Sequence, residues 1–201
     1  SDGDPALRAR LAEAAGVTPE GRFRPGSPIV AGSTAEVAAR WAPLLPHLSA
    51  RDLEREANRR ASEAVRLGPA PAAADMDGLL AGLAARGLAL GVATHDSEAA
   101  AAAHLEALGV AGRFGFVAGY DSGHGLKPGP GMVRAFCAAV GIAPAETAMV
   151  GDSLHDLGAG RAAGAGLVVG VLTGPATEAD LAPHADAVIG SIADLPDLLA
   201  D

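Results

Sequence analysis

Lysine and cysteine are almost missing from this sequence of 201 residues. The one cysteine, Cys137, excludes an internal disulfide and a cysteine-based zinc cluster. Acids outnumber basic residues by 24 to 15, and a net charge of −9 disfavours a nucleic-acid binder that relies on phosphate neutralisation. No uninterrupted apolar run reaches the roughly 18 residues of a membrane span, and no secretion signal opens the chain. These absences predict a cytoplasmic protein with neither a nucleic-acid nor a membrane partner.

Lys127 is the single lysine of the chain, which contains 14 arginines. Alanine and glycine are abundant, which suggests a coding bias that replaces lysine by arginine wherever a generic charge is enough. A compact ammonium on a flexible stem does what a planar guanidinium cannot do in a tight oxyanion site. The survival of one lysine therefore points to a functional role, and a solvated loop charge is the alternative.

The charges divide the chain into two parts. Residues 1–74 carry ten Arg and nine acids, whereas residues 75–201 carry five basic residues and fifteen acids. Caps and stops predict helices in the first part: a start at Asp4-Pro5 with a stop at Gly16, an S-x-x-E capping box at Ser33, and a third helix from Ser49 to about residue 66. The stiff Pro69-Ala70-Pro71 segment is the best candidate linker.

The second part alternates between short apolar runs and helical segments. The runs, which predict strands, cover residues 88–93, 114–118, 148–150, 167–172 and 187–189. The helical segments cover about 73–86, 97–108, 130–140, 154–163, 177–185 and a last one from about 192. This alternation predicts an α/β fold with a parallel sheet covered on both faces, in which ligands bind beyond the carboxyl ends of the strands.

Residues that could take part in binding or catalysis follow three of these strands. Asp152 follows a strand and Asp156 lies one helical turn further on, which suits a Mg²⁺ site but also an ordinary helix cap. Thr94 ends another strand, where its hydroxyl and the next N–H could bind an anion or simply cap the following helix. Lys127 lies in a glycine-rich loop before Pro128.

The ordered set of strand-Thr94, loop-Lys127-Pro128 and strand-Gly151-Asp152 with Asp156 resembles the haloacid dehalogenase superfamily, in its phosphoglycolate-phosphatase-like branch. The segment 92–97 is similar to the second motif of that family, Lys127-Pro128 to the third, and 150–156 to the fourth. The resemblance covers about residues 73–201. It implies a Rossmann-like core over 71–201 and a helical cap domain over 1–70.

One motif of the family is absent. An apolar strand ending in D-x-D-G-T, which carries the Asp nucleophile, has no counterpart, because Asp2 and Asp4 follow no strand. In the family this strand lies between those that carry Thr94 and Asp152. We therefore expect the chain to begin part-way through a longer protein, after roughly 25–40 further residues that include this strand and the first part of the cap. We also expect the Thr94 and Asp152 strands not to pair directly, and the 201 residues alone to be inactive.

The resemblance implies a Mg²⁺-dependent phosphatase that acts on a small phosphorylated metabolite, such as phosphoglycolate, through an aspartyl-phosphate. Thr94 and Lys127 would be catalytic, and both would bind the substrate together with His95. Asp152 would hold the metal, with Asp156 behind it or as a weaker ligand. Arg22 and Arg24 could also reach a substrate anion, although solvated arginines are the alternative. The oligomeric state, monomer or homodimer, stays open.

Two other functions compete with this interpretation. Gly151-Asp152-Ser153-Leu154 spells the G-D-S-L of a group of serine esterases, with Ser153 as the nucleophile. The usual D-x-x-H partner is missing, however, because Asp180 and His184 are four residues apart. A non-catalytic binding module of the same fold is the second alternative.

Overall fold

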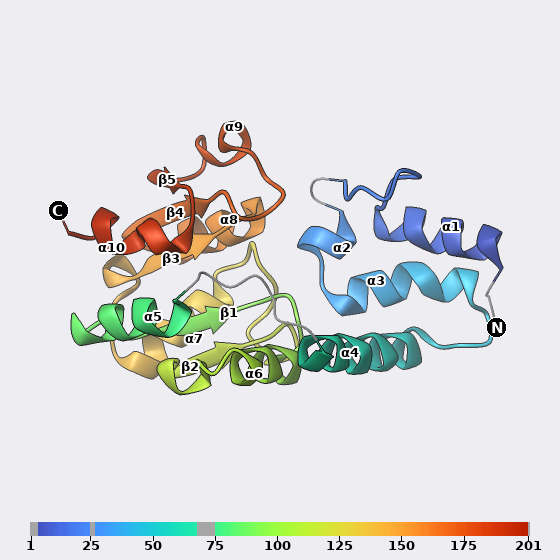
Figure 1. Cartoon of the computed structure of the whole chain (residues 1–201), viewed down its shortest axis with the longest axis horizontal. Helices are drawn as coiled ribbons and strands as arrows, with labels where there is room; N and C mark the ends of the chain where they lie inside the picture. The colour runs from blue at the N-terminus through green and yellow to red at the C-terminus, as the bar shows by residue number, and fades with distance from the viewer. Residues whose placement is uncertain (1–3, 25–26, 68–74, 201) are drawn as a thin grey trace.

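The computed structural model describes residues 4–24, 27–67 and 75–200 (Figure 1). The described residues up to 67 form a layer of helices, and residues 75–200 form an α/β unit beside it. The helical layer contains α1 (Pro5–Ala15), α2 (Pro28–Ala31), α3 (Thr34–Trp41), the 3-10 turn η1 (Ala42–Leu44) and α4 (Ala50–Leu67). The predicted boundary between two domains at residues 70 and 71 and the Pro69–Pro71 linker lie outside the described residues.

Local capping explains where the helices of this layer begin and end. The Asp4 carboxylate accepts the N–H of Ala6 at 2.9 Å, and α1 ends at Gly16, whose φ of +88° is easily reached only without a side chain. The predicted capping box of α3 is present, since Ser33 and Glu36 each accept the other's backbone N–H. The Trp41 indole donates to the Leu11 carbonyl at 2.8 Å and fixes α3 against α1.

The α/β unit alternates as its apolar runs predict. Its strands are β1 (Gly91–Ala93), β2 (Phe116–Ala118), β3 (Ala148–Gly151), β4 (Leu167–Val171) and β5 (Ala187–Ile189). Its helices are α5 (Met76–Ala85), α6 (Glu98–Ala107), α7 (Gly131–Val140), α8 (Leu154–Ala163), α9 (Glu178–Leu181) and α10 (Leu195–Leu198), with 3-10 turns η2 (Ala111–Arg113), η3 (Pro144–Glu146) and η4 (Ile192–Asp194). None of the helices in the described ranges is long and apolar enough to cross a membrane.

In the part of the chain that the structure describes, the strands form two parallel sheets rather than one. β1 pairs with β2, and β3, β4 and β5 pair in that order. Within the described residues β1 and β3 do not pair with each other, which agrees with the break expected between the Thr94 and Asp152 strands. Because all five strands are parallel within their sheets and a helix follows each of β1, β3 and β4, the unit is an α/β fold, as the sequence predicts.

Helices connect the two sheets. α7 packs against β1 and β2, and α8 packs against β3 and β4. Between α7 and α8 lies a buried apolar cluster of Val133, Cys137, Ala159 and Ala163. α5 contacts both η2, which precedes β2, and α10, which follows β5. The carboxyl ends of β1 and β3 thereby face the same space although no backbone ladder joins them.

Several elements differ from the predictions. The apolar run 88–93 pairs as a strand only over Gly91–Ala93, and Leu88 at its start is 41% exposed. The helix predicted over 177–185 ends at Leu181. The glycine- and proline-rich connector before Ser33 contains the short helix α2, whose Pro28 occupies the first turn, where a missing N–H costs nothing.

Candidate active site

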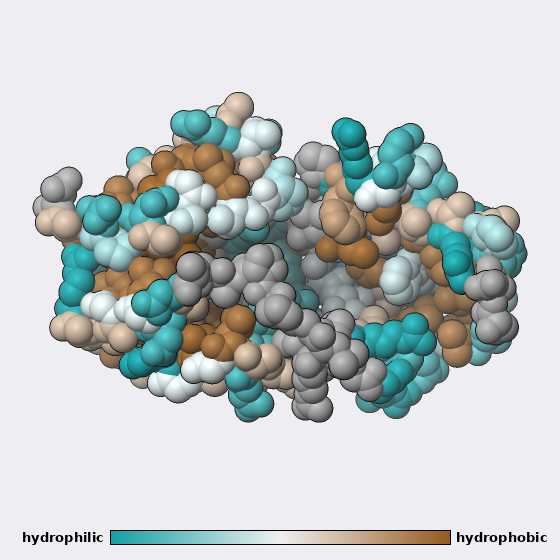
Figure 2. All heavy atoms as spheres, in the orientation of Figure 1, coloured by the Kyte–Doolittle hydropathy of each residue, from teal (hydrophilic) through white to brown (hydrophobic). Residues whose placement is uncertain are grey.

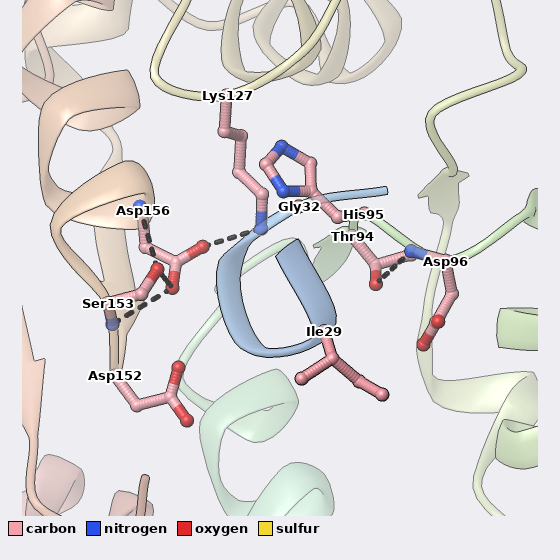
Figure 3. A pocket seen from close by; sticks show the side chains of 9 residues that line it. All are labelled: Ile29, Gly32, Thr94, His95, Asp96, Lys127, Asp152, Ser153 and Asp156. Atoms are coloured by element: carbon pink, nitrogen blue, oxygen red, sulfur yellow. Dashed lines mark hydrogen bonds and ion pairs between the residues drawn. The ribbon is translucent and has the colours of Figure 1, made fainter. Parts of the chain in front are cut away.

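A pocket of about 270 Å³ lies where the carboxyl ends of β1 and β3 meet the helical layer (Figure 3). Figure 2 shows the corresponding hollow between the α/β unit and the helices. The lining residues come from α2 and its end, from the loop after β1, from the loop before α7, and from the start of α8: Ile29, Gly32, Thr94, His95, Asp96, Lys127, Asp152, Ser153 and Asp156.

Thr94 continues β1 by one residue. Its N–H donates to the Ala118 carbonyl at 2.9 Å, and its Oγ1 accepts the N–H of Asp96 at 3.0 Å. The hydroxyl therefore uses its oxygen to shape the loop, and its proton can still be donated to a ligand. Helix α6 is capped by Ser97 rather than by Thr94, since Ser97 Oγ accepts the N–H of Ala100.

Lys127 links the end of β1 to helix α8 through its side chain. Its Nζ donates to the Ala93 carbonyl at the end of β1, at 2.8 Å, and to Asp156 Oδ1 in α8, at 2.5 Å. The side chains of Lys127 and Asp156 are only 9% and 10% exposed, so this is a buried ion pair. An ammonium group has three protons, and these two bonds leave the third for a ligand in the pocket.

Asp156 is held on both of its oxygens. Oδ1 accepts from Lys127, while Oδ2 accepts the hydroxyl of Ser153 at 2.6 Å and the N–H of Ser153 at 3.2 Å. The bond from the Ser153 N–H, together with the Asp156 N–H that donates to Ser153 Oγ at 3.3 Å, forms the capping box of α8. A Cβ on Gly151 would lie 2.2 Å from the Cβ of Asp156, so this close approach requires glycine. Asp156 is therefore fixed as a partner of Lys127 and of the helix start.

Asp152 takes part in neither of these contacts, and Figure 3 shows its carboxylate directed toward the space beside Ile29. Burial raises the pKa of Asp152, and the negative charge of Asp156 raises it further, while Lys127 acts in the opposite direction. A Cβ on Gly174 would lie 2.1 Å from Oδ2 of Asp152, so the loop after β4 closes tightly around this carboxylate. The site thus concentrates negative charge that one lysine does not balance.

The carboxylates of Asp152 and Asp156 meet the requirements of a hard divalent cation only in part. Nowhere in the described ranges do three or more Asp, Glu, His or Cys side chains gather into a possible metal site. Mg²⁺, however, keeps several waters and is commonly held by one or two carboxylates together with substrate phosphates. Asp152, whose carboxylate faces the pocket, fits that pattern, and Asp156 is less suitable because both of its oxygens are engaged.

The structure brings Thr94, His95, Lys127, Asp152 and Asp156 to one pocket, as the sequence predicts. The His95 ring lies 5.7 Å from that of His155, centroid to centroid. Arg22 and Arg24 do not line the pocket: both are exposed, beside the bridge between Val17 and Phe23.

Sequence reasoning missed the contributions of Ile29, Gly32, Asp96 and Ser153 to the pocket lining. Ile29 stood out only as an apolar residue in a connector rich in glycine and proline, which gave no sign of where it would lie. The G-D-S-L string could have pointed to Ser153, but for a different chemistry. Its hydroxyl donates to Asp156, Asp180 accepts from Thr177, and His184 is exposed, so the bonds between described residues form no Ser-His-Asp set.

Comparison with known sequences agrees with the family resemblance. Residues 4–164 match the family described as haloacid dehalogenase-like hydrolase. The chain is 43% identical over 91 residues to a phosphoglycolate phosphatase of Rhodospirillum rubrum, covering 45% of this chain and 38% of that protein. It is 37% identical over 119 residues to a phosphoglycolate phosphatase of Escherichia coli K12, covering 58% of this chain and 46% of that protein. These alignments span less than half the length of either relative.

Solved structures share the fold. A predicted phosphoglycolate phosphatase from Haemophilus somnus superposes with a TM-score of 0.72 at 19% identity, over 96% of this chain and 89% of that one. CbbY from Rhodobacter sphaeroides, solved in complex with phosphate, superposes with a TM-score of 0.71 at 22% identity, over 94% and 87%. At these identities the likeness concerns the fold alone.

Proposed function

Because this chain belongs to the haloacid dehalogenase-like hydrolases, we propose that it serves the hydrolysis of a phosphate monoester of a small metabolite. The observation that carries the proposal is the convergence of Thr94, Lys127 and Asp152 on one pocket, from three separate loops. A hydroxyl donor, an ammonium and a spare carboxylate are the groups needed to hold a phosphoryl group and its metal. Phosphoglycolate is the substrate we favour, since the relatives in Rhodospirillum rubrum and Escherichia coli bear that name and the pocket is small.

The residues of this chain have distinct roles in the proposal. The Thr94 hydroxyl donates its proton to a phosphoryl oxygen, with His95 beside it. Lys127, fixed by Ala93 and Asp156, presents its third proton to the same group and offsets the charge that develops there. Asp152 would hold Mg²⁺, with Asp156 as a weaker contributor. When bound, the metal would neutralise the phosphate and bring it close to a carboxylate.

The nucleophile is not assigned to this chain. The resemblance implies attack by an Asp carboxylate on phosphorus, with loss of the alcohol, followed by hydrolysis of the aspartyl-phosphate by water. The 201 residues contain no D-x-D-G-T. The ends of β1 and β3 both reach the pocket, although their sheets do not pair. We therefore assign to this part of the molecule the binding of the phosphoryl group and the neutralisation of its charge. We further propose that the helical layer acts as the cap over this pocket.

A titration of Mg²⁺ and inorganic phosphate tests the proposal. Calorimetry on the wild-type chain should show Mg²⁺-dependent phosphate binding, and Asp152→Asn should abolish it because a direct ligand is lost. Asp156→Asn should weaken binding less. Asp96→Asn is the matched control, since Asp96 also lines the pocket but is exposed and bonds through its backbone to Thr94. Equal Mg²⁺ affinity in wild type and Asp152→Asn would refute the metal assignment.

A further inference from the structure

Tyr120 connects the helical layer to the loop after β1, which carries Thr94 and lines the pocket. It is the single tyrosine of the chain and lies half-buried just after β2. Its phenol hydroxyl donates to Glu54 and accepts from the Asn58 amide at 3.0 Å, and both partners belong to α4. The Tyr120 side chain thus binds two residues of α4 that lie one helical turn apart.

The backbone of the same residue reaches the pocket. The Tyr120 N–H donates to the Asp96 carbonyl at 3.0 Å, and the Asp96 N–H donates to Thr94 Oγ1 at 3.0 Å. Three steps therefore lead from α4 to the hydroxyl that we assign to the phosphoryl group: Glu54 to the Tyr120 phenol, the Tyr120 backbone to Asp96, and Asp96 to Thr94.

The loop that carries Tyr120 is built to transmit a displacement rather than absorb it. A Cβ on Gly119 would lie 2.1 Å from the N of Glu98, so the two loops touch backbone to backbone. Ser122 Oγ accepts the Gly119 N–H at 2.9 Å and donates to the Glu98 carboxylate at 2.6 Å. Asp121 accepts the Glu98 N–H at 2.8 Å. With the loops fixed to each other in this way, moving Tyr120 moves the segment 94–98.

We propose that Tyr120 is a positioning residue that couples the docking of α4 to the geometry of the Thr94 hydroxyl, so that anion affinity and the packing of the helical layer change together. The effect on the anion rests on the proposed function, whereas the connection between α4 and residues 94–98 does not. Because coupling between two sites is reciprocal, a ligand that favours the ordered Thr94 loop must also stabilise α4.

Hydrogen exchange without ligand tests the connection itself. Tyr120→Phe keeps the ring and removes the hydroxyl, and it should speed amide exchange in both 50–60 and 94–98. Glu54→Ala should do the same, and Glu54→Gln, which keeps an acceptor oxygen, should restore much of the protection. The matched control is Glu56→Ala, since Glu56 lies on the same helix but pairs with Arg59 and Arg60. Faster exchange confined to 50–60 in Tyr120→Phe would overturn the proposal.

Inorganic phosphate with Mg²⁺ tests the coupling. It should slow amide exchange in α4 of the wild type but not of Tyr120→Phe, and Tyr120→Phe should bind phosphate about fivefold more weakly, at the lower end of usual coupling. Phosphate binding that is equal in both proteins, with no effect on α4, would overturn the proposal and leave the proposed function intact. A wild type that binds no phosphate would instead refute the proposed function, and exchange without ligand would then decide the connection.

Tyrosine absorbance tests the contact between Tyr120 and Glu54 directly. Burial and the hydrogen bond to Glu54 raise the pKa of Tyr120 to about 12. With a single tyrosine in the chain, its alkaline titration is unambiguous. Glu54→Ala should lower this pKa and Glu56→Ala should leave it unchanged. An unchanged pKa in Glu54→Ala would contradict the contact from which the argument starts.

Discussion

Replacing Lys127 by methionine should destabilise the fold far more than the loss of an ordinary ion pair. The change keeps most of the apolar stem and removes the ammonium, together with its bonds to Ala93 and Asp156. It leaves the Asp156 carboxylate, 10% exposed, without its cation. Since the same ammonium bridges the end of β1 and helix α8, its loss also removes a direct link between the two sheets.

The expected magnitude follows from burial. Removing one partner of a buried pair costs about 3–5 kcal/mol, because the other charge stays behind uncompensated. Asp156 keeps its bonds from Ser153, which places Lys127→Met near the lower end, at about 3 kcal/mol. For a chain of this length that corresponds to a fall of roughly 6–12 °C in the thermal midpoint. Removing the charge of the partner as well, in Lys127→Met/Asp156→Asn, should recover part of the loss.

Urea unfolding followed by circular dichroism at pH 7 measures these differences. Arg113→Met is the control: Arg113 pairs with Asp77 at 2.7 Å between α5 and η2, but the two side chains are 38% and 57% exposed. Such an exposed pair contributes about 0–1 kcal/mol. If Lys127→Met cost no more than Arg113→Met, or if the double variant were less stable than the sum of the single changes, the buried pair would not have the role assigned to it.

Three other outcomes are expected. Gly174→Ala should weaken Mg²⁺ binding about tenfold in calorimetry, because its Cβ would lie 2.1 Å from Asp152 Oδ2; unchanged binding would contradict the tight enclosure. Hydrogen bonds from Arg161 and the Val168 N–H lower the pKa of Asp186, so the stability that they contribute is present at neutral pH and is lost as pH falls through the lowered pKa. The thermal midpoint of Arg161→Met should therefore fall less than that of wild type between pH 6 and pH 3, and equal falls would argue against this linkage. The 201-residue chain should not hydrolyse p-nitrophenyl phosphate with Mg²⁺. If it did so robustly, and if the double variant Asp2→Ala/Asp4→Ala lost that activity, the nucleophile would lie within the sequence.

Local signals explain why the elements of this fold were predictable. The capping box at Ser33 and the stop at Gly16 each depend on a few neighbouring residues, and the structure has both. The site residues at the strand ends were predictable for a related reason. Ligands of parallel α/β sheets bind beyond the carboxyl ends of the strands, so Thr94 and Asp152, which both follow strands, were expected at one site, although the two strands belong to separate sheets.

Contacts between distant segments were not predictable in this way. Ile29 and Gly32 reach the pocket from a connector with no periodic pattern, and only tertiary packing places them there. Lys127 could be singled out by its rarity, but its bond to Ala93 depends on the path of a glycine-rich loop. The link from Tyr120 to Glu54 joins residues 66 positions apart, for which no motif exists.

The division of the strands into two sheets also shapes how the chain folds. Each sheet consists of strands that are consecutive along the chain. Partners such as Ala148 and Leu167 are 19 residues apart (167 − 148), whereas Lys127 and Asp156 are 29 apart (156 − 127), so the cost of loop closure favours forming each sheet before the two are joined. The α/β unit is then expected to behave as two cooperative units that open independently in hydrogen exchange. We expect the contacts that join them, the Lys127 pair and the cluster between α7 and α8, to form late in folding. Mutations there should then accelerate unfolding more than they slow folding, so that this junction would set how long the assembled unit survives.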